Sequence, residues 1–260
     1  MKCATLVLVL SLAAGGPAAS VFADDVPPAA PAVPVPPTHD PDAAKFLTGL
    51  ADKIEKQAAE EAIPTIKTLV NYWKDPAVKT ETKAPIPGLI ARYGKRKDAP
   101  VALAAVAALE EIGKGDGSKN LVVVLEALLD RGDLDSEVTK AVFGSLKRLA
   151  DPEEAVVKVL TKLFHFKDDT VVAQAVDAIG GYGAAPFELR RSLFEEVMKS
   201  FEGVESESHR PANKAAFNRW SVVGGSVLSA ITALGHRSVT DLAAARQWFN
   251  DHSKDADAWK

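Results

Sequence analysis

Apolar positions in four stretches of the chain follow one helical pattern. Each stretch carries Val and Ala at helical spacing and closes on a small residue. Residues at this spacing line one face of an α-helix, so each stretch predicts an amphipathic helix. Copies that recur roughly every 30 to 40 residues are typical of helical repeats that stack on one another. The pattern predicts an all-α solenoid with repeat helices at 98–113, 135–150, 168–183 and 221–235.

The rest of the chain after Pro41 is also helical in pattern, and no strand or hairpin pattern competes with it. Residues 121–125 (LVVVL) could form a strand alone, but their apolar pattern continues to Leu129, beyond strand length, so a helix is expected. Gly224 and Gly225 predict a kink in the last long helix. A mobile polar loop is expected at 203–213. The further helices are predicted at 43–63, 64–74, 87–94, 120–132, 155–166, 187–203, 213–235 and 239–252.

Helix starts and stops are marked by capping residues and glycines. Asp42, Asp98, Asp135–Ser136 and Asp168–Asp169 each precede an apolar run, where a side-chain oxygen can accept a hydrogen bond from a free backbone N–H. Asp151, Pro152 and two Glu follow the order of an N-cap, a first-turn proline and an acidic first turn, so Asp151 is expected to cap the next helix. Glycines at 113, 115 and 117 and the Gly-Gly-Tyr-Gly run at 180–183 predict helix ends. The run at 180–183 follows a helix, unlike a phosphate-binding loop, which follows a strand.

The first 41 residues are of a different kind. Residues 1–23 read as a secretory signal, with Lys2, an apolar run over 4–14, a Gly-Gly-Pro break and a cleavage site after Ala23. An uncleaved membrane anchor is the alternative, but it needs about 20 apolar residues in a row. Residues 24–41 form a Pro-rich linker, expected to be extended or disordered, which acts as a spacer or as a ligand for a proline-reading domain. The chain is therefore expected to be periplasmic or secreted.

Composition narrows the function further. The only cysteine, Cys3, lies within the predicted signal, so cleavage would remove disulfide, thiol and cysteine-metal chemistry together. Net charge is −4 at pH 7 and the basic residues form no run, which excludes the electrostatic signature of a nucleic-acid-binding protein. The five histidines show no His-x-x-x-His or similar ligand spacing, so no metal site and no cofactor are expected. No Gly-x-Ser-x-Gly motif and no convincing Ser/His/Asp set occurs, and no catalytic residue is assigned.

Two of the repeats match the pattern Asp-x-x-Val-x-x-x-Ala-x-x-Ala-Leu-Gly, through Asp98, Val101, Ala105, Ala108 and Leu109, and through Asp168, Val171, Ala175, Ala178, Ile179 and Gly180. The helix at 137–150 fits loosely, and the copy ending at Gly235 lacks the Asp. The chain thereby resembles the HEAT-repeat family, in particular the short bacterial repeats also found in phycobilin lyases. The resemblance implies a right-handed solenoid whose second helices line the concave face. The expected parts are a signal peptide (1–23), a linker (24–41), an irregular helical cap (42–79), the repeat domain (80–255) and a tail (256–260).

The same resemblance implies where a partner would bind. Aligning the second helices on their small closing residues places a set of side chains on the concave face, with Lys147, Asp177 and Thr232 in one row. The set is Lys140, Phe143, Lys147, Gln174, Asp177, Ser229 and Thr232. The leading hypothesis is a non-catalytic scaffold or adaptor that binds another protein. The alternatives are a self-associating structural envelope protein, and an enzyme of unknown type or an accessory subunit of one.

Aromatic residues gather toward the end of the chain, at Trp220, Trp248, Phe249 and Trp259. They could form a recognition patch. The favoured interpretation is that they seal the last apolar face, because a terminal repeat has no neighbour to cover it. Tyr72 and Trp73 are expected to act in the same way at the other end.

Overall fold

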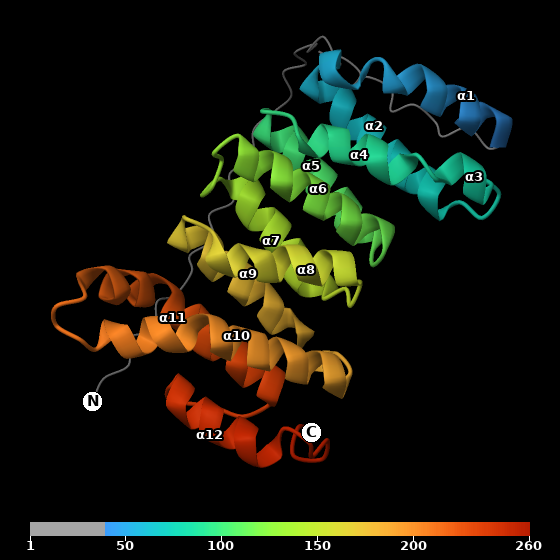
Figure 1. Ribbon diagram of the computed structural model, residues 1–260. Helices are drawn as coiled ribbons and strands as arrows, with labels where there is room; N and C mark the ends of the chain where they lie inside the picture. The colour runs from blue at the N-terminus through green and yellow to red at the C-terminus, as the bar shows by residue number, and fades with distance from the viewer. Residues whose placement is uncertain (1–39) are drawn as a thin grey trace, which may run out of the picture. The chain divides into compact units, whose positions relative to one another are not determined.

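The computed structural model describes residues 40–260 (Figure 1), and these residues are helical, with no strand among them. This confirms the predicted all-α class. The predictions for the signal peptide, and for the linker up to residue 39, lie outside the described residues. None of the described helices is both long and apolar enough to cross a membrane.

The α-helices are α1 (Asp40–Ala51), α2 (Ala59–Lys74), α3 (Thr80–Lys83), α4 (Ile86–Gly94), α5 (Ala99–Ile112), α6 (Asp116–Asp130), α7 (Glu137–Leu149), α8 (Glu154–Lys162), α9 (Asp169–Gly180), α10 (Phe187–Ser208), α11 (Lys214–Gly235) and α12 (Leu242–His252), with 3-10 turns at η1 (Ile54–Lys56), η2 (Leu163–His165) and η3 (Gly181–Ala184).

The helices contact one another in two rows. In the first row α4 contacts α6, and α6 contacts α8; in the second row α2, α5, α7, α9 and α11 contact in that order. Neighbours in the chain, such as α5 with α6 and α8 with α9, join the two rows. The core lies between them, where small side chains such as Ala105 and Ala175 are 0% exposed and allow close approach of the helices. This arrangement brings α7, α9 and α11 side by side.

Capping residues set the starts of α5, α7 and α9 as expected. Asp98 accepts a hydrogen bond from the backbone N–H of Val101 at 3.5 Å, and Asp168 accepts one from Thr170 at 2.9 Å. At α7 the cap is Ser136, which accepts from Thr139 at 3.2 Å, and not Asp135. Each such cap stabilises its helix by about 1 kcal/mol.

The predicted role of Asp151 is wrong. The helix after it, α8, begins only at Glu154, and its N-cap residue Glu153 makes no side-chain cap. The carboxylate of Asp151 instead accepts hydrogen bonds from the N–H of Gly115 at 2.5 Å and from the hydroxyl of Ser118, both at the start of α6. Its other oxygen accepts from the N–H of Glu153 at 3.0 Å. Asp151 therefore links two consecutive helix pairs and does not cap a helix.

The N-terminal helices begin and end at other places than predicted. The sequence predicts a single helix over 43–63 that is capped by Asp42. The structure instead has α1, which begins at Asp40, then a break in the α-helix at 52–58, and then α2. Pro64 does not start a helix but lies inside α2. The break is fixed by Gln57, which donates to the hydroxyl of Thr65 at 3.0 Å and accepts from the hydroxyl of Tyr93. Contacts distant in sequence thus decide this boundary.

Three glycine and loop predictions are also corrected. Gly117 lies in the first turn of α6 and does not end α5; a Cβ there would meet the carbonyl oxygen of Leu109 at 2.2 Å. Residues 203–208 continue α10 because buried Glu205 accepts the N–H of Leu242 at 2.9 Å, so the loop covers only 209–213. Gly224 and Gly225 do not interrupt α11, and a Cβ on Gly224 would meet the Trp220 ring at 2.9 Å.

The C-terminal aromatic residues mostly seal the core, as the favoured interpretation expects. Trp248, Phe249 and Trp259 are buried, and all three pack against Phe194 of α10. Trp259, in the predicted tail, is 0% exposed, and its carbonyl oxygen accepts a hydrogen bond from buried Arg190 at 2.8 Å. Trp220 is only partly buried. Near the other end Tyr72 is buried beside Phe46, and Trp73 is half-buried.

Candidate functional site

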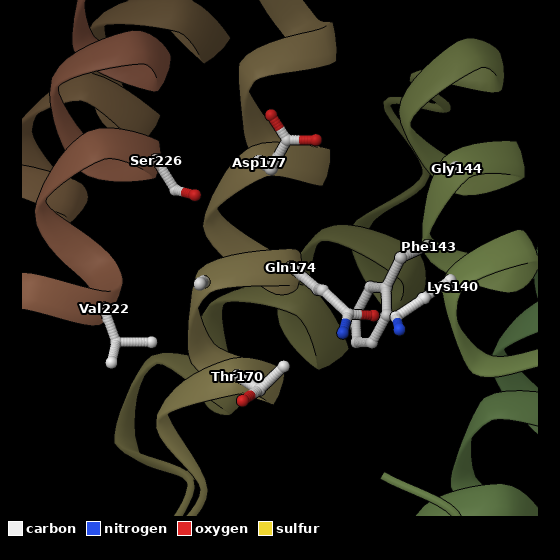
Figure 2. A pocket seen from close by; sticks show the side chains of 9 residues that line it. Lys140, Phe143, Gly144, Thr170, Gln174, Asp177, Val222 and Ser226 are labelled. Carbon is white, nitrogen blue, oxygen red and sulfur yellow. The ribbon is translucent and has the colours of Figure 1, made fainter. Parts of the chain in front are cut away.

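A groove of about 310 Å³ crosses the second row where α7, α9 and α11 meet (Figure 2). α7 contributes its middle turns, α9 one full side, and α11 the turn that begins at Val222. In Figure 2 the Gln174 side chain extends from α9 toward α7, while Val222 and Ser226 form the opposite wall. The lining residues are Lys140, Phe143, Gly144, Thr170, Ala173, Gln174, Asp177, Val222 and Ser226.

The structure brings several of the predicted binding residues together in this groove. Lys140 and Phe143 of α7 and Gln174 and Asp177 of α9 all line it. Lys147 lies next to it, because its ammonium group pairs with Asp177 at 2.8 Å. Two helices that are separated in the chain thus present their predicted side chains to the same space.

The two predicted residues of α11 do not join this groove. Ser229 is exposed and Thr232 is half-buried, and neither lines it. Of the expected row of Lys147, Asp177 and Thr232, the first two residues lie together and form an ion pair. No hydrogen bond within residues 40–260 connects Thr232 to that pair.

Phe143 and Gln174 are not freely exposed on the surface. The Phe143 side chain is only 3% exposed, so it forms apolar lining and belongs to the core. Gln174 is half-buried, and its Oε1 atom is shielded from solvent with no hydrogen-bond partner in the described chain. A buried polar group without a partner costs about 1–3 kcal/mol. The groove therefore contains an acceptor that the described chain leaves unsatisfied.

Sequence reasoning missed five lining residues, namely Gly144, Thr170, Ala173, Val222 and Ser226. Thr170 and Ala173 could have been found, because they stand seven and four residues before Asp177 and so share its helix face. Val222 and Ser226 could not. Aligning α11 on its closing glycine selects Ser229 and Thr232, whereas its packing against α9 brings a turn nearer its start to the groove.

Charges on the second row are paired from helix to helix. Lys74 of α2 pairs with Glu111 of α5, and Glu110 of α5 accepts from Arg148 of α7 at 2.6 Å. α7 is tied to α9 by Lys147 and Asp177, and α9 to α11 by Asp169 and Arg219 at 3.0 Å. The hydrogen bond from Arg148 lowers the pKa of Glu110, which keeps that carboxylate charged. Each exposed pair contributes little stability, about 0–1 kcal/mol.

This pairing changes what Lys147 can do. If its charge were free, reversing that charge would weaken partner binding alone. Since Asp177 already balances it at 2.8 Å, Lys147→Glu would place two carboxylates together and disturb the α7–α9 contact as well. Lys147 is therefore a poor residue for testing the groove.

Two exposed apolar side chains lie on α11, and one of them lines the groove. Phe217 is 61% exposed and Val222 is 47% exposed, although large apolar residues elsewhere in the described chain are mostly buried. Val222 lines the groove, and Phe217 lies on the same helix five residues before it. Exposed apolar surface beside a concavity is a common feature of protein-binding sites.

The polar side chains that line this groove form no catalytic set and no metal-ligand set. Its polar side chains are one Lys, one Asp, one Gln, one Thr and one Ser, and the Asp is paired with Lys147. Over residues 40–260, no three His, Cys, Asp or Glu side chains are grouped so that they could hold a metal ion. The arrangement suits contact with a ligand through apolar surface and hydrogen bonds.

Comparison of the chain with protein-family models, with curated proteins and with solved structures finds no match.

Proposed function

We propose that this protein is a non-catalytic binding protein that holds a segment of another protein in the groove between α7, α9 and α11. The observation that supports this best is the convergence of three helices, distant in sequence, on one groove with an unsatisfied acceptor and exposed Val222. Convergent polar groups within an apolar concavity are the usual features of a ligand site.

The fold that would present this groove is, in our proposal, a right-handed HEAT-like solenoid with the second row on its concave side. Two observations support it. Alternate helices contact along both rows, as stacked helix pairs require. Three second-row helices, α5, α7 and α9, also begin with matching caps, at Asp98, Ser136 and Asp168. In such an array the second row would form a continuous binding surface.

We also propose that the protein acts outside the cytoplasmic membrane, in the periplasm or after secretion. The support is the order of charged start, apolar run, break and small-residue site in residues 1–23. The exported protein is expected to begin at Asp24, because cleavage after Ala23 removes the signal. Intact-mass measurement of the protein from the extracytoplasmic fraction tests this. A mass that corresponds to a chain starting at Met1 would contradict it.

Filling the groove is expected to abolish partner binding without unfolding the protein. Ser226→Trp places an indole among the lining residues, whereas Ser229→Trp, one turn later on α11 and exposed, leaves the groove open. Partners are identified by mass spectrometry after pull-down from the extracytoplasmic fraction, and affinities are measured by calorimetry. We expect at least a tenfold loss for Ser226→Trp, about 1.4 kcal/mol, and less than a twofold loss for Ser229→Trp.

Two results would contradict this proposal. Equal binding by both tryptophan variants would mean that the partner does not use the groove. Loss of binding on charge reversal at Lys158 or Lys162, exposed residues of α8 in the first row, would place the interaction on the opposite side. Melting temperatures of all variants, measured by circular dichroism, separate lost binding from lost folding.

A further inference from the structure

We infer that the groove takes an extended, uncharged polypeptide segment with an apolar side chain, one backbone N–H of which donates a hydrogen bond to Gln174. This inference rests on the proposed function and adds the chemistry of the ligand. It follows from three features of the groove, namely its unsatisfied amide, its paired charges and its apolar wall.

The Gln174 amide is the first feature. Its Oε1 atom is shielded from solvent, and no group in residues 40–260 donates a hydrogen bond to it. No hydrogen bond from its Nε2 atom to the described chain occurs either. With Oε1 as the shielded atom the missing partner is a donor, whereas the exchanged amide would need an acceptor. Because Oε1 is shielded, the half-buried Gln174 side chain has to turn toward the groove to meet a ligand. Since buried polar groups are nearly always hydrogen-bonded, a ligand that then supplies the missing partner gains by binding here.

The paired charges are the second feature, and they determine the charge of the ligand. Lys140 pairs with Asp135 at 2.8 Å and Asp177 pairs with Lys147 at 2.8 Å, so both charged lining residues are already neutralised. Glu110 and Arg148 form the next pair along the second row. A charged ligand would have to compete with these partners, whereas a neutral one would not.

The apolar wall is the third feature. Val222 is 47% exposed in the groove, and Phe143 and Ala173 add apolar lining beside it. An apolar side chain of the ligand can therefore be buried against Val222.

Free backbone N–H groups distinguish an extended segment from a helix. In an α-helix the N–H groups beyond the first turn bond to carbonyls of the same helix, so they cannot reach Gln174. An extended segment keeps its N–H groups available, and its alternate side chains point toward the surface. The unsatisfied amide therefore favours an extended ligand over a docked helix.

The test uses the full chain, prepared as exported, and random dodecapeptides displayed on phage. Selected peptides are synthesised, and their backbone amides are replaced one at a time by esters, which lack the N–H donor. Each peptide is titrated against wild type, Gln174→Leu, Ser226→Trp and Ser229→Trp, at low and high salt. Leucine keeps the approximate size of Gln174 and removes its hydrogen-bonding groups.

The expected result is a coupling between one amide of the peptide and Gln174. One ester position should weaken binding to wild type by about tenfold. The same ester should change binding to Gln174→Leu by less than twofold, because the partner atom is already gone. Selected peptides should be apolar and uncharged, and salt should change their affinity by less than twofold.

Other results overturn the inference, and they distinguish it from the proposed function. If Ser226→Trp abolishes binding but no ester couples to Gln174, the groove binds peptides and the assigned hydrogen bond is wrong. Charged peptides whose affinity falls with salt would overturn the neutral-ligand assignment in the same way. If no peptide is selected, or if selected peptides bind Ser226→Trp as tightly as wild type, the proposed function fails together with the inference.

Discussion

Ala175→Arg is expected to unfold the protein or to lower its melting temperature by at least roughly 10 °C, whereas Gln174→Arg is expected to change it little. Ala175 is 0% exposed and lies on the α9 face that packs into the core with Val171 and Ile179. Arginine there would overpack the contact between helices and bury an unpaired charge, a combined cost of about 4 kcal/mol or more. For a chain of this size each kcal/mol lowers the melting temperature by about 2–4 °C.

Gln174→Arg is the matched control, one residue away on the same helix. Gln174 is half-buried at the rim of the groove, so a longer side chain can extend toward solvent and keep its charge hydrated. Thermal unfolding of both variants, followed by far-UV circular dichroism, measures the difference. Similar melting temperatures would show that the core-facing side of α9 has been assigned incorrectly.

Local sequence signals predict the second row well for a physical reason. Val171, Ala175 and Ile179 are spaced to share one helix face, and all three are 0% exposed. Asp98 and Asp168 cap the helices that follow them, because a capping bond needs only residues two or three positions away. Periodicity and capping are local properties, so a single sequence is enough to read them.

The errors occur where contacts distant in sequence decide the structure. Asp151 has the local context of a cap, yet its carboxylate is bound by α6, more than thirty residues earlier in the chain. Residues 203–208 look like a loop but stay helical because Glu205 accepts a hydrogen bond from Leu242. Gly181 was predicted only to stop a helix, yet a Cβ there would meet the carbonyl oxygen of Lys147 at 2.1 Å. No local pattern records these partners.

In the candidate site, too, local spacing predicts some of the residues and contacts between distant helices decide the others. Gln174 and Asp177 could be assigned to one face of α9 from spacing alone, and both line the groove. Which turn of α11 completes the groove depends on the position of α11 along the axis of α9. The sequence of α11 alone does not determine that position. The pairing of Lys147 with Asp177 was hidden for the same reason, since it joins two helices.

Asp151→Asn is expected to lower the melting temperature by roughly 10 °C near neutral pH. Both carboxylate oxygens of Asp151 accept hydrogen bonds, one from Glu153 and the other from Gly115 and Ser118. An asparagine amide has only one oxygen, so in either orientation its NH₂ group faces a backbone N–H that needs an acceptor. Losing one or two buried hydrogen bonds in this way costs about 3 kcal/mol, and each kcal/mol corresponds to about 2–4 °C.

Asp241→Asn provides the control. Asp241 is also an acceptor for a backbone N–H, that of Ala244 at 2.7 Å, but it caps the start of α12 at an exposed position. Asparagine is as good a helix cap as aspartate, so this variant should melt close to wild type. If both variants lose the same stability, the buried link between Asp151 and α6 is no stronger than an ordinary cap.

The loss at Asp151 should also depend on pH, and its direction follows from the pKa. Burial raises the pKa of Asp151, but the hydrogen bonds from Gly115, Ser118 and Glu153 outweigh this, and the net pKa lies below the usual 3.8. A carboxylate with a lowered pKa in the folded state stabilises the protein above its unfolded pKa, and the contribution disappears as the pH falls through the folded value. The difference in unfolding free energy between wild type and Asp151→Asn should therefore be constant from neutral pH to about 5 and shrink below about 4. Denaturant titrations across that pH range measure this difference in unfolding free energy. A difference that stayed constant or grew on acidification would mean that the charge of Asp151 does not stabilise the contact between α6 and the start of α8.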